Sequence, residues 1–242
     1  MTRYYVYDSS FYGFLTAVFL AYTDSSAYIT ARPVQLGFDD DSVSVVTEEE
    51  KAQRVLKKIR QYDKGAVGEI YALLKSNLLD GAQRAYRYIQ VIMRHQTCVR
   101  TRLADTDVLN AMEGVRKVWN EVHLMKGLLR FMETENGVMY APYAPDNDIT
   151  EYLLPHFVER FPSLSFIIHD TKRNLAGLYN QKDTLTVPLD KGDIFLSKTE
   201  EAFCSLWKEY YDAVNIPERK RLKQMKGCMP VRYWNFLPEK RP

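Results

Sequence analysis

The hydrophobic pattern of this chain changes period near residue 127, from the 3.6-residue repeat of a helix to the two-residue repeat of a strand. Upstream of this point the apolar residues recur mainly at helical spacing. They predict a short strand at 4–7 and then helices at 11–22, 48–62, 66–79, 82–95 and 106–127. A chain that begins mainly helical and then alternates favours the α+β class.

Downstream of residue 127 the alternating runs are short. They predict strands at 129–133, 138–143, 165–170 and within 174–187, followed by a helix at 199–214. The dipeptide Asn136-Gly137 separates the first two runs and favours a type I′ turn, in which both central residues need positive φ. We therefore expect an antiparallel β-hairpin at this point.

Two local signals concern the starts of helices. Thr47 with Glu50 forms a capping box. Pro155 has no N–H to donate, so a kink or a restart is expected within the helix that Asp148 would cap. His156 would then lie in the first turn of a helix, where the positive dipole end disfavours imidazolium and attracts an anion such as phosphate.

The chain has 242 residues, of which 46% are hydrophobic, so it can bury a full core. We expect a single compact domain, or two lobes at 1–103 and 104–242. The N-terminal lobe would be mainly helical, and it would pack with an α+β lobe that contains the antiparallel hairpin.

Charge and cysteine content exclude some classes of protein. The net charge is only +2, although 51–100 and 215–242 are rich in Lys and Arg, so a local anionic partner is compatible with the sequence. The three cysteines are too far apart for a disulfide framework or a zinc or iron–sulfur ligand set, and we expect no metal, no cofactor and a cytoplasmic location. The longest apolar stretch, 11–22, is too short to span a bilayer, so no membrane association is expected.

Sequence motifs exclude several enzyme classes as well. The chain has no G-x-x-x-x-G-K-[ST] phosphate loop, no G-x-G-x-x-G, no G-x-S-x-G and no H-E-x-x-H. ATPases, dinucleotide enzymes, serine hydrolases and zincins therefore lose support.

The helix at 106–127 carries the first candidate site. His123 follows Trp119 by four residues and borders the apolar stripe, whereas Glu121 points away from that stripe. His123 is either a hydrogen-bonded histidine at the edge of the core or an acid–base group. Arg130 shares a strand face with Leu128 and Met132, so its guanidinium needs a carboxylate, from Asp170 or Glu121, or a phosphate.

Two further groups of cations lie beside aromatic residues. Arg160 follows His156 by four residues, and this pair is either a phosphate site or a solvated face of a helix. The basic run that contains Arg219 precedes Arg232-Tyr233-Trp234, where aromatic rings beside cations could stack exposed bases. Trp234 could instead anchor the terminal segment in the core.

These residues resemble a bacterial family of DNA-metabolism and DNA-repair proteins of unassigned activity. The resemblance covers nearly the whole chain. It is carried by short motifs in a fixed order: Tyr5-Val-Tyr-Asp8, Gly13-Phe-Leu15, Glu121-Val-His123, Arg130-Phe131, Pro145-Asp146, His156-Phe157, Arg160-Phe-Pro162, Asp170 with Arg173, Leu206-Trp207 with Tyr210, Arg219, Met229-Pro230 and Tyr233-Trp234.

The resemblance implies partners rather than a reaction. Members of the family look like partners of a radical-SAM protein, and some resemble fusions to a uracil-DNA glycosylase-like domain. This chain departs from the pattern at Ser9, where a glycine is usual, and at Arg221, where an asparagine is usual. These departures bear on the local turn and on a polar contact near the C-terminus.

Three hypotheses follow. The first is an accessory protein of DNA repair or modification that binds DNA and a partner enzyme, through Arg130, His156, Arg160, Arg173, Arg219, Arg232, Tyr233 and Trp234. The second is an enzyme acting on a damaged or modified nucleotide, with His123 or His156 as acid or base and Glu121 or Asp170 orienting it. The third is a scaffold whose polar core is only structural.

Overall fold

The computed structural model of the chain describes residues 1–32, 35, 37–190, 195–214 and 221–240. Contacts group the chain into two compact units, Met1–Trp119 (unit 1) and Asn120–Pro242 (unit 2). The division falls inside one long helix. Both units combine helices with a sheet, and the α+β class is confirmed.

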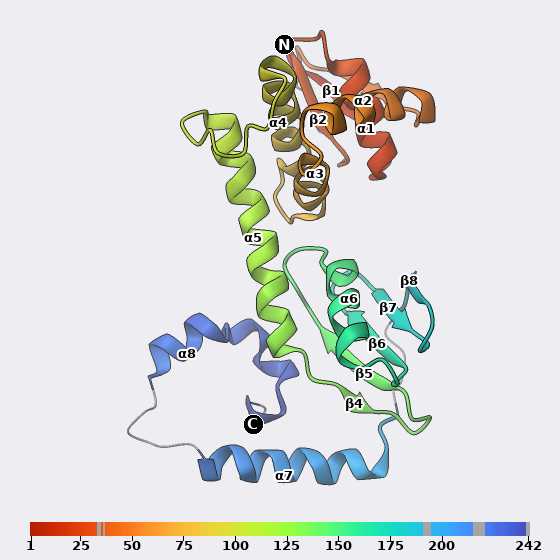
Figure 1. Ribbon diagram of the computed structural model, residues 1–242, viewed down its shortest axis with the longest axis vertical. Coiled ribbons are helices and arrows are strands. Elements are labelled where there is room, and N and C mark those ends of the chain that lie inside the picture. The colour runs from red at the N-terminus through yellow and green to blue at the C-terminus, as the bar shows by residue number, and fades with distance from the viewer. Residues whose placement is uncertain (33–34, 36, 191–194, 215–220, 241–242) are drawn as a thin grey trace. The chain divides into compact units, whose positions relative to one another are not determined.

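Unit 1 is built around a three-stranded parallel sheet of order β2-β1-β3 (Figure 1). Its elements are β1 (Arg3–Val6), α1 (Phe11–Ala21), β2 (Ala27–Thr30), β3 (Asp41–Ser44), α2 (Glu49–Tyr62), α3 (Ala66–Lys75), α4 (Gly81–His95) and the first part of α5 (Thr106–Leu128). The sequence predicted the helices and β1 but neither β2 nor β3. Both missed strands have four residues, and β3 is mostly exposed, so neither carries a clear two-residue alternation.

The start of α2 differs from the expected capping box. The N-cap residue is Glu48, with no side-chain capping bond. Thr47 instead donates its hydroxyl to Asp8 Oδ2 at 2.8 Å. The capping-box prediction was therefore wrong, because the N-cap is one residue later and Thr47 lies before the start of α2.

Unit 2 contains a five-stranded mixed sheet of order β4-β5-β6-β7-β8 (Figure 1). After the end of α5 its elements are β4 (Met132–Glu133), β5 (Met139–Tyr143), α6 (Thr150–Arg160), β6 (Phe166–Asp170), β7 (Leu175–Tyr179), β8 (Thr184–Pro188), α7 (Lys198–Val214), α8 (Leu222–Cys228) and the 3₁₀ turns η2 (Val231–Phe236) and η3 (Pro238–Lys240). Only β5 and β6 pair in parallel, and α6 is the crossover that joins them.

The expected hairpin between β4 and β5 is confirmed, but its turn type is not. Among its central residues only Gly137 has positive φ, at 74°, so the turn is not type I′. The Gly137 N–H donates to Thr134 O at 2.9 Å and closes a turn that ends in a left-handed glycine.

Helix α6 runs through Pro155 without a break. The carbonyl that Pro155 leaves without a helical donor belongs to Glu151, and both residues are exposed, so water can replace the lost bond. His156 therefore lies in the second half of α6, and the prediction that it occupies a first helical turn was wrong.

The buried face of α5 also differs from the predicted stripe. Trp119 is 45% exposed, whereas Glu121 is only 5% exposed and lies beside the buried Val118, Val122 and Met125. The buried stripe of α5 passes through Val118 rather than Trp119. The buried face is therefore rotated about the helix axis from the predicted one, and it includes Glu121. No helix among the described residues is both long and apolar enough to cross a membrane.

Candidate functional site

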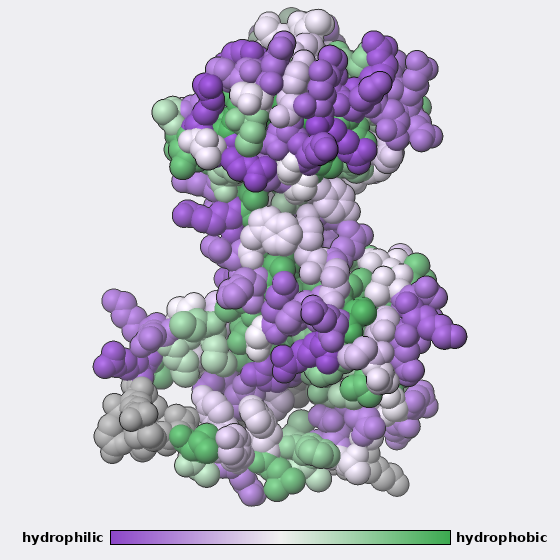
Figure 2. Space-filling view, viewed as in Figure 1, coloured by the Kyte–Doolittle hydropathy of each residue, from purple (hydrophilic) through white to green (hydrophobic). Residues whose placement is uncertain are grey.

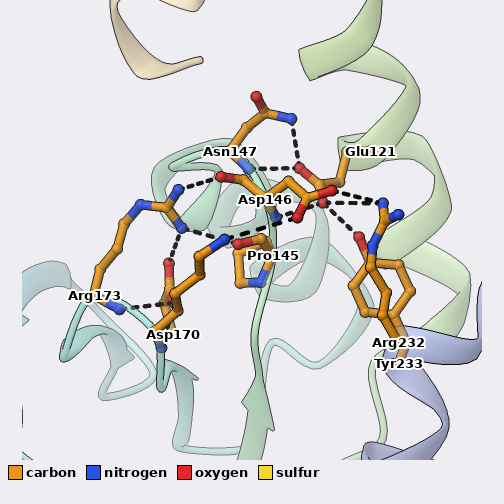
Figure 3. A network of polar contacts seen from close by, with 9 residues as sticks. Glu121, Pro145, Asp146, Asn147, Asp170, Arg173, Arg232 and Tyr233 are labelled. Carbon is orange, nitrogen blue, oxygen red and sulfur yellow. Dashed lines mark hydrogen bonds and ion pairs between the residues drawn. The ribbon is translucent and has the colours of Figure 1, made fainter. Parts of the chain in front are cut away.

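Unit 2 holds a buried polar network centred on Glu121 of α5 (Figure 3). Its Oε1 accepts the Asp146 N–H at 2.8 Å and the Tyr233 hydroxyl, and its Oε2 accepts the Asn147 N–H at 2.8 Å and the Asn147 side-chain amide at 2.6 Å. Arg232 adds an ion pair of 3.0 Å to Asp146. Each oxygen of the Glu121 carboxylate therefore accepts two hydrogen bonds.

The hydroxyl of Tyr233 remains protonated in this setting. Burial, and after it the hydrogen bond to the Glu121 carboxylate, raises the pKa of Tyr233. The Arg232 guanidinium lies 4.6 Å from the centre of the Tyr233 ring. Tyr233 therefore acts as a donor that ties η2 to α5 within unit 2.

Arg173 extends the network toward the end of β6. Its guanidinium pairs with the fully buried Asp170 at 2.8 Å, and it also donates to Pro145 O at 3.2 Å and to Asp146 O. The other Asp170 oxygen accepts the backbone N–H groups of Lys172 and Arg173. Asp170 and Arg173 thus clamp the loop that also contacts Glu121.

This arrangement is closed rather than open. Beside Tyr233 the described residues leave a void of only about 10 Å³, below the volume of a ligand. Glu121, Asp170 and Arg173 are brought together, but neither predicted histidine joins them. His123 is exposed on α5, and His156 lies on α6 against Phe157, with ring centroids 4.9 Å apart.

A second polar cluster forms where α5 ends. Arg130 pairs with Glu239 at 2.9 Å and donates to Gly127 O at 2.9 Å, and Glu239 accepts the Trp207 indole N–H at 3.0 Å. Burial alone would raise the pKa of Glu239, but hydrogen bonds from its own backbone, from Trp207 and from Arg130 lower it overall. Asp170 and Glu121 were thus wrong as carboxylate partners of Arg130. Arg130 lies between α5 and β4 rather than on a strand face.

The pocket beside this cluster, here called the aromatic pocket, has a volume of about 690 Å³. Its aromatic lining residues come from the α5–β4 segment, α6 and α7: Phe131, Phe157, Phe161, Phe203 and Trp207. The cations that line it are Lys126, Arg130 and Arg160. In Figure 2, hydrophobic side chains gather over the part of unit 2 where Figure 1 places α7.

The aromatic rings and cations of the pocket are in direct contact. Phe131 meets Phe157 and Phe161 edge to face, with centroid distances of 5.0 and 5.4 Å. The Arg160 guanidinium lies 5.5 Å from the centre of the Phe161 ring. Burial, followed by the positive charges of Lys126 and Arg160, lowers the pKa of the neighbouring His156.

The remaining predicted site residues lie apart from this pocket or outside the described residues. Arg232 and Tyr233 belong to the Glu121 network. The indole N–H of Trp234 donates to Met229 O at 2.9 Å, and the half-buried ring anchors the terminal segment. Arg219 lies outside the residues that the structure describes.

Sequence reasoning missed several residues of both clusters. Asp146 and Asn147 both donate backbone N–H groups to Glu121, which leave no sequence signal, and Asn147 adds its side-chain amide. Phe203 and Trp207 are four residues apart on α7, and their exposures of 67% and 41% mark an open aromatic face that such spacing could have indicated. The buried His169 was also missed: its Nε2 donates to Leu189 O, and its Nδ1 lies 2.7 Å from the Tyr140 hydroxyl.

Residues 80–239 match the model of a family described as a domain of unknown function, DUF4130. The match covers more than half of the chain, and the chain therefore belongs to this family. It includes both the Glu121 network and the aromatic pocket. Among curated proteins, none matches the chain.

Proposed function

We propose that this chain is an accessory protein of DNA repair or modification that binds single-stranded or locally unpaired DNA. The aromatic pocket of unit 2 would receive an unstacked base, and the cations at its border would contact the adjacent phosphates. One observation carries the proposal, namely that several aromatic side chains and cations line one open pocket.

The aromatic side chains suit a base because every base has a π-face. Stacking on an aromatic ring contributes about 1–3 kcal/mol per base and is tolerant of sequence. Phe203 and Trp207 keep exposures of 67% and 41% at this pocket, so their rings are accessible. A pocket of about 690 Å³ lies in the range of small-ligand sites.

Two cations of the pocket are available for phosphate. Lys126 and Arg160 form no ion pair with any residue that the structure describes, whereas Arg130 is committed to Glu239. The two carboxylates that also line the pocket accept hydrogen bonds from the chain, Glu200 from the Glu133 N–H at 2.9 Å and Glu133 from the Ser197 hydroxyl at 3.2 Å. Phosphate contacts would therefore come from Lys126 and Arg160.

The enzyme hypothesis has less support. Glu121 and Asp170 already accept hydrogen bonds from backbone and side chains, so neither carboxylate orients a histidine. His156 lies beside Phe157 but is not among the described lining residues of the pocket. Binding rather than acid–base chemistry is the function that this geometry favours.

An accessory protein also needs an enzyme to serve. The radical-SAM protein that the resemblance implies is our proposed partner, and a uracil-DNA glycosylase-like protein is the second. Either enzyme would act on a base that this chain holds out of the stack, which is how chemistry on a duplex base becomes accessible.

Fluorescence anisotropy with labelled DNA tests the proposal. The probes are a single strand, a perfect duplex and a duplex with one unpaired base, each at about 50 mM and about 200 mM salt. The test variants are Lys126→Ala with Arg160→Ala, and Trp207→Ala. The matched control removes the same two charge types from the exposed surface of α5, as Arg116→Ala with Lys117→Ala.

We expect the wild type to prefer the single strand and the unpaired base. The pocket double variant should lose roughly tenfold in affinity, and the slope of log affinity against log salt should fall by about 1.4, because two phosphate contacts are removed. Trp207→Ala should weaken binding with little change in slope. Absence of binding by the folded wild type, or equal losses in the pocket and control variants, would overturn the proposal.

A further inference from the structure

Unit 1 carries a groove of about 910 Å³ between α1, α2 and α4. Its floor is mainly aliphatic, with Val18, Val55, Ile89 and Met93 among the lining residues. Ile89 is fully buried and Val18 is 1% exposed, so the floor is part of the core of the unit. We call this feature the basic groove because of its border.

The charged residues at the border of the groove are all positive. Arg54, Lys57 and Lys58 of α2 line it, and no described lining residue carries a carboxylate. These three side chains form no ion pair with any described residue, although Lys58 donates to Gln61 Oε1 at 3.4 Å. By contrast, Lys51 on the same helix pairs with Glu48 at 2.7 Å.

Two of the three rings that line the groove are covered on one side by cations of the chain, whereas the third, Tyr22, is 51% exposed. Arg54 lies 5.0 Å from the centre of the Phe19 ring, and Lys58 lies 5.7 Å from the centre of the Tyr62 ring. A base would have to compete with these contacts to stack on either of these two rings. Aliphatic side chains and Met93 instead offer a floor that adapts to apolar side chains of a peptide.

We propose that the basic groove docks an amphipathic helix of a partner protein. Apolar side chains of that helix, at positions i, i+3 or i+4 and i+7, would pack on the half-buried Val55 and Met93, as in other helix-in-groove complexes. Asp or Glu residues on its flank would face Arg54, Lys57 and Lys58, and this charge complementarity selects an acidic partner. The proposal does not depend on the DNA binding proposed for unit 2.

The experiment uses the full chain and three fluorescent helical peptides that share one leucine face. Their flanks carry Glu, Gln or Lys, so only the charge differs. The test variant reverses two border charges, Lys57→Glu with Lys58→Glu, and the control reverses two charges elsewhere in unit 1, Arg116→Glu with Lys117→Glu. Methyl NMR of Ile89 and Met93 in the wild type locates the bound peptide without any substitution.

The Glu-flanked peptide should bind most tightly and the Lys-flanked peptide most weakly. Reversal of the two border charges should weaken the binding of the Glu-flanked peptide by roughly tenfold. The control variant should bind this peptide as tightly as the wild type does. The Ile89 and Met93 methyl signals should shift on binding. Equal affinity for all three peptides, or no shift at these methyls, overturns the proposal. A shift caused by an oligothymidylate strand but not by the Glu-flanked peptide would identify a nucleic-acid site instead and also overturn it.

Discussion

The carboxylate of Glu121 accepts the hydroxyl of Tyr233, 112 positions later in the chain, and both side chains are buried in unit 2. Tyr233→Phe removes one donor from a buried carboxylate, and we expect a loss of about 1.5–3 kcal/mol in the free energy of unfolding. Glu121→Gln should cost more, about 3–5 kcal/mol, because an amide NH₂ would face donors that need an acceptor. Urea denaturation followed by tryptophan fluorescence measures both.

Tyr179→Phe is the matched control for the Tyr233 substitution. The Tyr179 hydroxyl donates to the neutral Pro162 carbonyl at 3.1 Å, so its loss should cost only about 1 kcal/mol. If the two Tyr→Phe variants lose the same free energy, the Glu121 carboxylate contributes no more than an ordinary acceptor. The role assigned to the network would then be wrong.

Arg173 stabilises unit 2 through a buried charge, whereas its neighbour Lys172 does not. Arg173→Ala leaves the Asp170 carboxylate buried without its counter-charge and frees two loop carbonyls, so a loss of about 3 kcal/mol is expected. Lys172, whose side chain is 52% exposed, lies 3.7 Å from Asp146, and Lys172→Ala should cost less than about 0.5 kcal/mol. Equal losses for the two neighbours in denaturant titrations would contradict this assignment.

A double-mutant cycle separates the Asp170–Arg173 pair from the loop contacts. Asp170→Asn and Arg173→Ala should be non-additive, with a coupling free energy of about 1–3 kcal/mol, because they remove the same ion pair. Additive losses would show that Arg173 acts only through the carbonyls of the loop.

Ser9 has a φ of 65°, in the left-handed region that favours glycine. Ser9→Gly removes a backbone strain of about 1–2 kcal/mol but makes the unfolded chain more flexible, so a net gain of about 0.5–1 kcal/mol is expected. Ser25→Gly is the control, because the φ of Ser25 is not positive. This substitution should be neutral or destabilising. A thermal melt in which Ser9→Gly lowers the transition would contradict the argument.

The sequence predicts the helices of this chain well and its polar contacts poorly. The α5 helix was placed at 106–127 and is found at Thr106–Leu128, because an apolar repeat over many residues fixes both type and length. Its phase was wrong, since Trp119 was counted with the buried stripe. One misassigned aromatic residue therefore placed Glu121 outside the core instead of inside it.

The polar partners depend on contacts that local patterns do not encode. Arg130 pairs with Glu239, 109 positions away, and the sequence offered no reason to prefer that carboxylate over Asp170. The short strands β2 and β3 were not predicted, for a related reason. Their pairing with β1, rather than their composition, makes them strands. Residue types at the site were predictable, but their pairing was not.

The pKa of His156, which lies near the aromatic pocket, makes the stability of the protein depend on pH. Burial, followed by the positive charges of Lys126 and Arg160, lowers its pKa below the ordinary value of 6.5. Between the folded and unfolded pKa values the unfolded chain binds the proton more readily, so the free energy of unfolding falls as the pH drops through about 6.5. The loss is complete below the folded pKa. His156→Gln removes this contribution, and the stability of the wild type relative to the variant should decline between about pH 7 and pH 5.

NMR titration of the His156 ring tests the cause directly. Lys126→Met and Arg160→Met should each raise the pKa of His156 toward its ordinary value, because each removes a positive charge that opposes protonation. Lys117→Met in unit 1 serves as the control and should leave the titration unchanged. A single-stranded oligonucleotide bound at the pocket would add negative charge near His156 and should raise its pKa as well. A titration that neither the two pocket variants nor the oligonucleotide moves would show that burial alone sets this pKa, and that the pocket cations do not act on the imidazole.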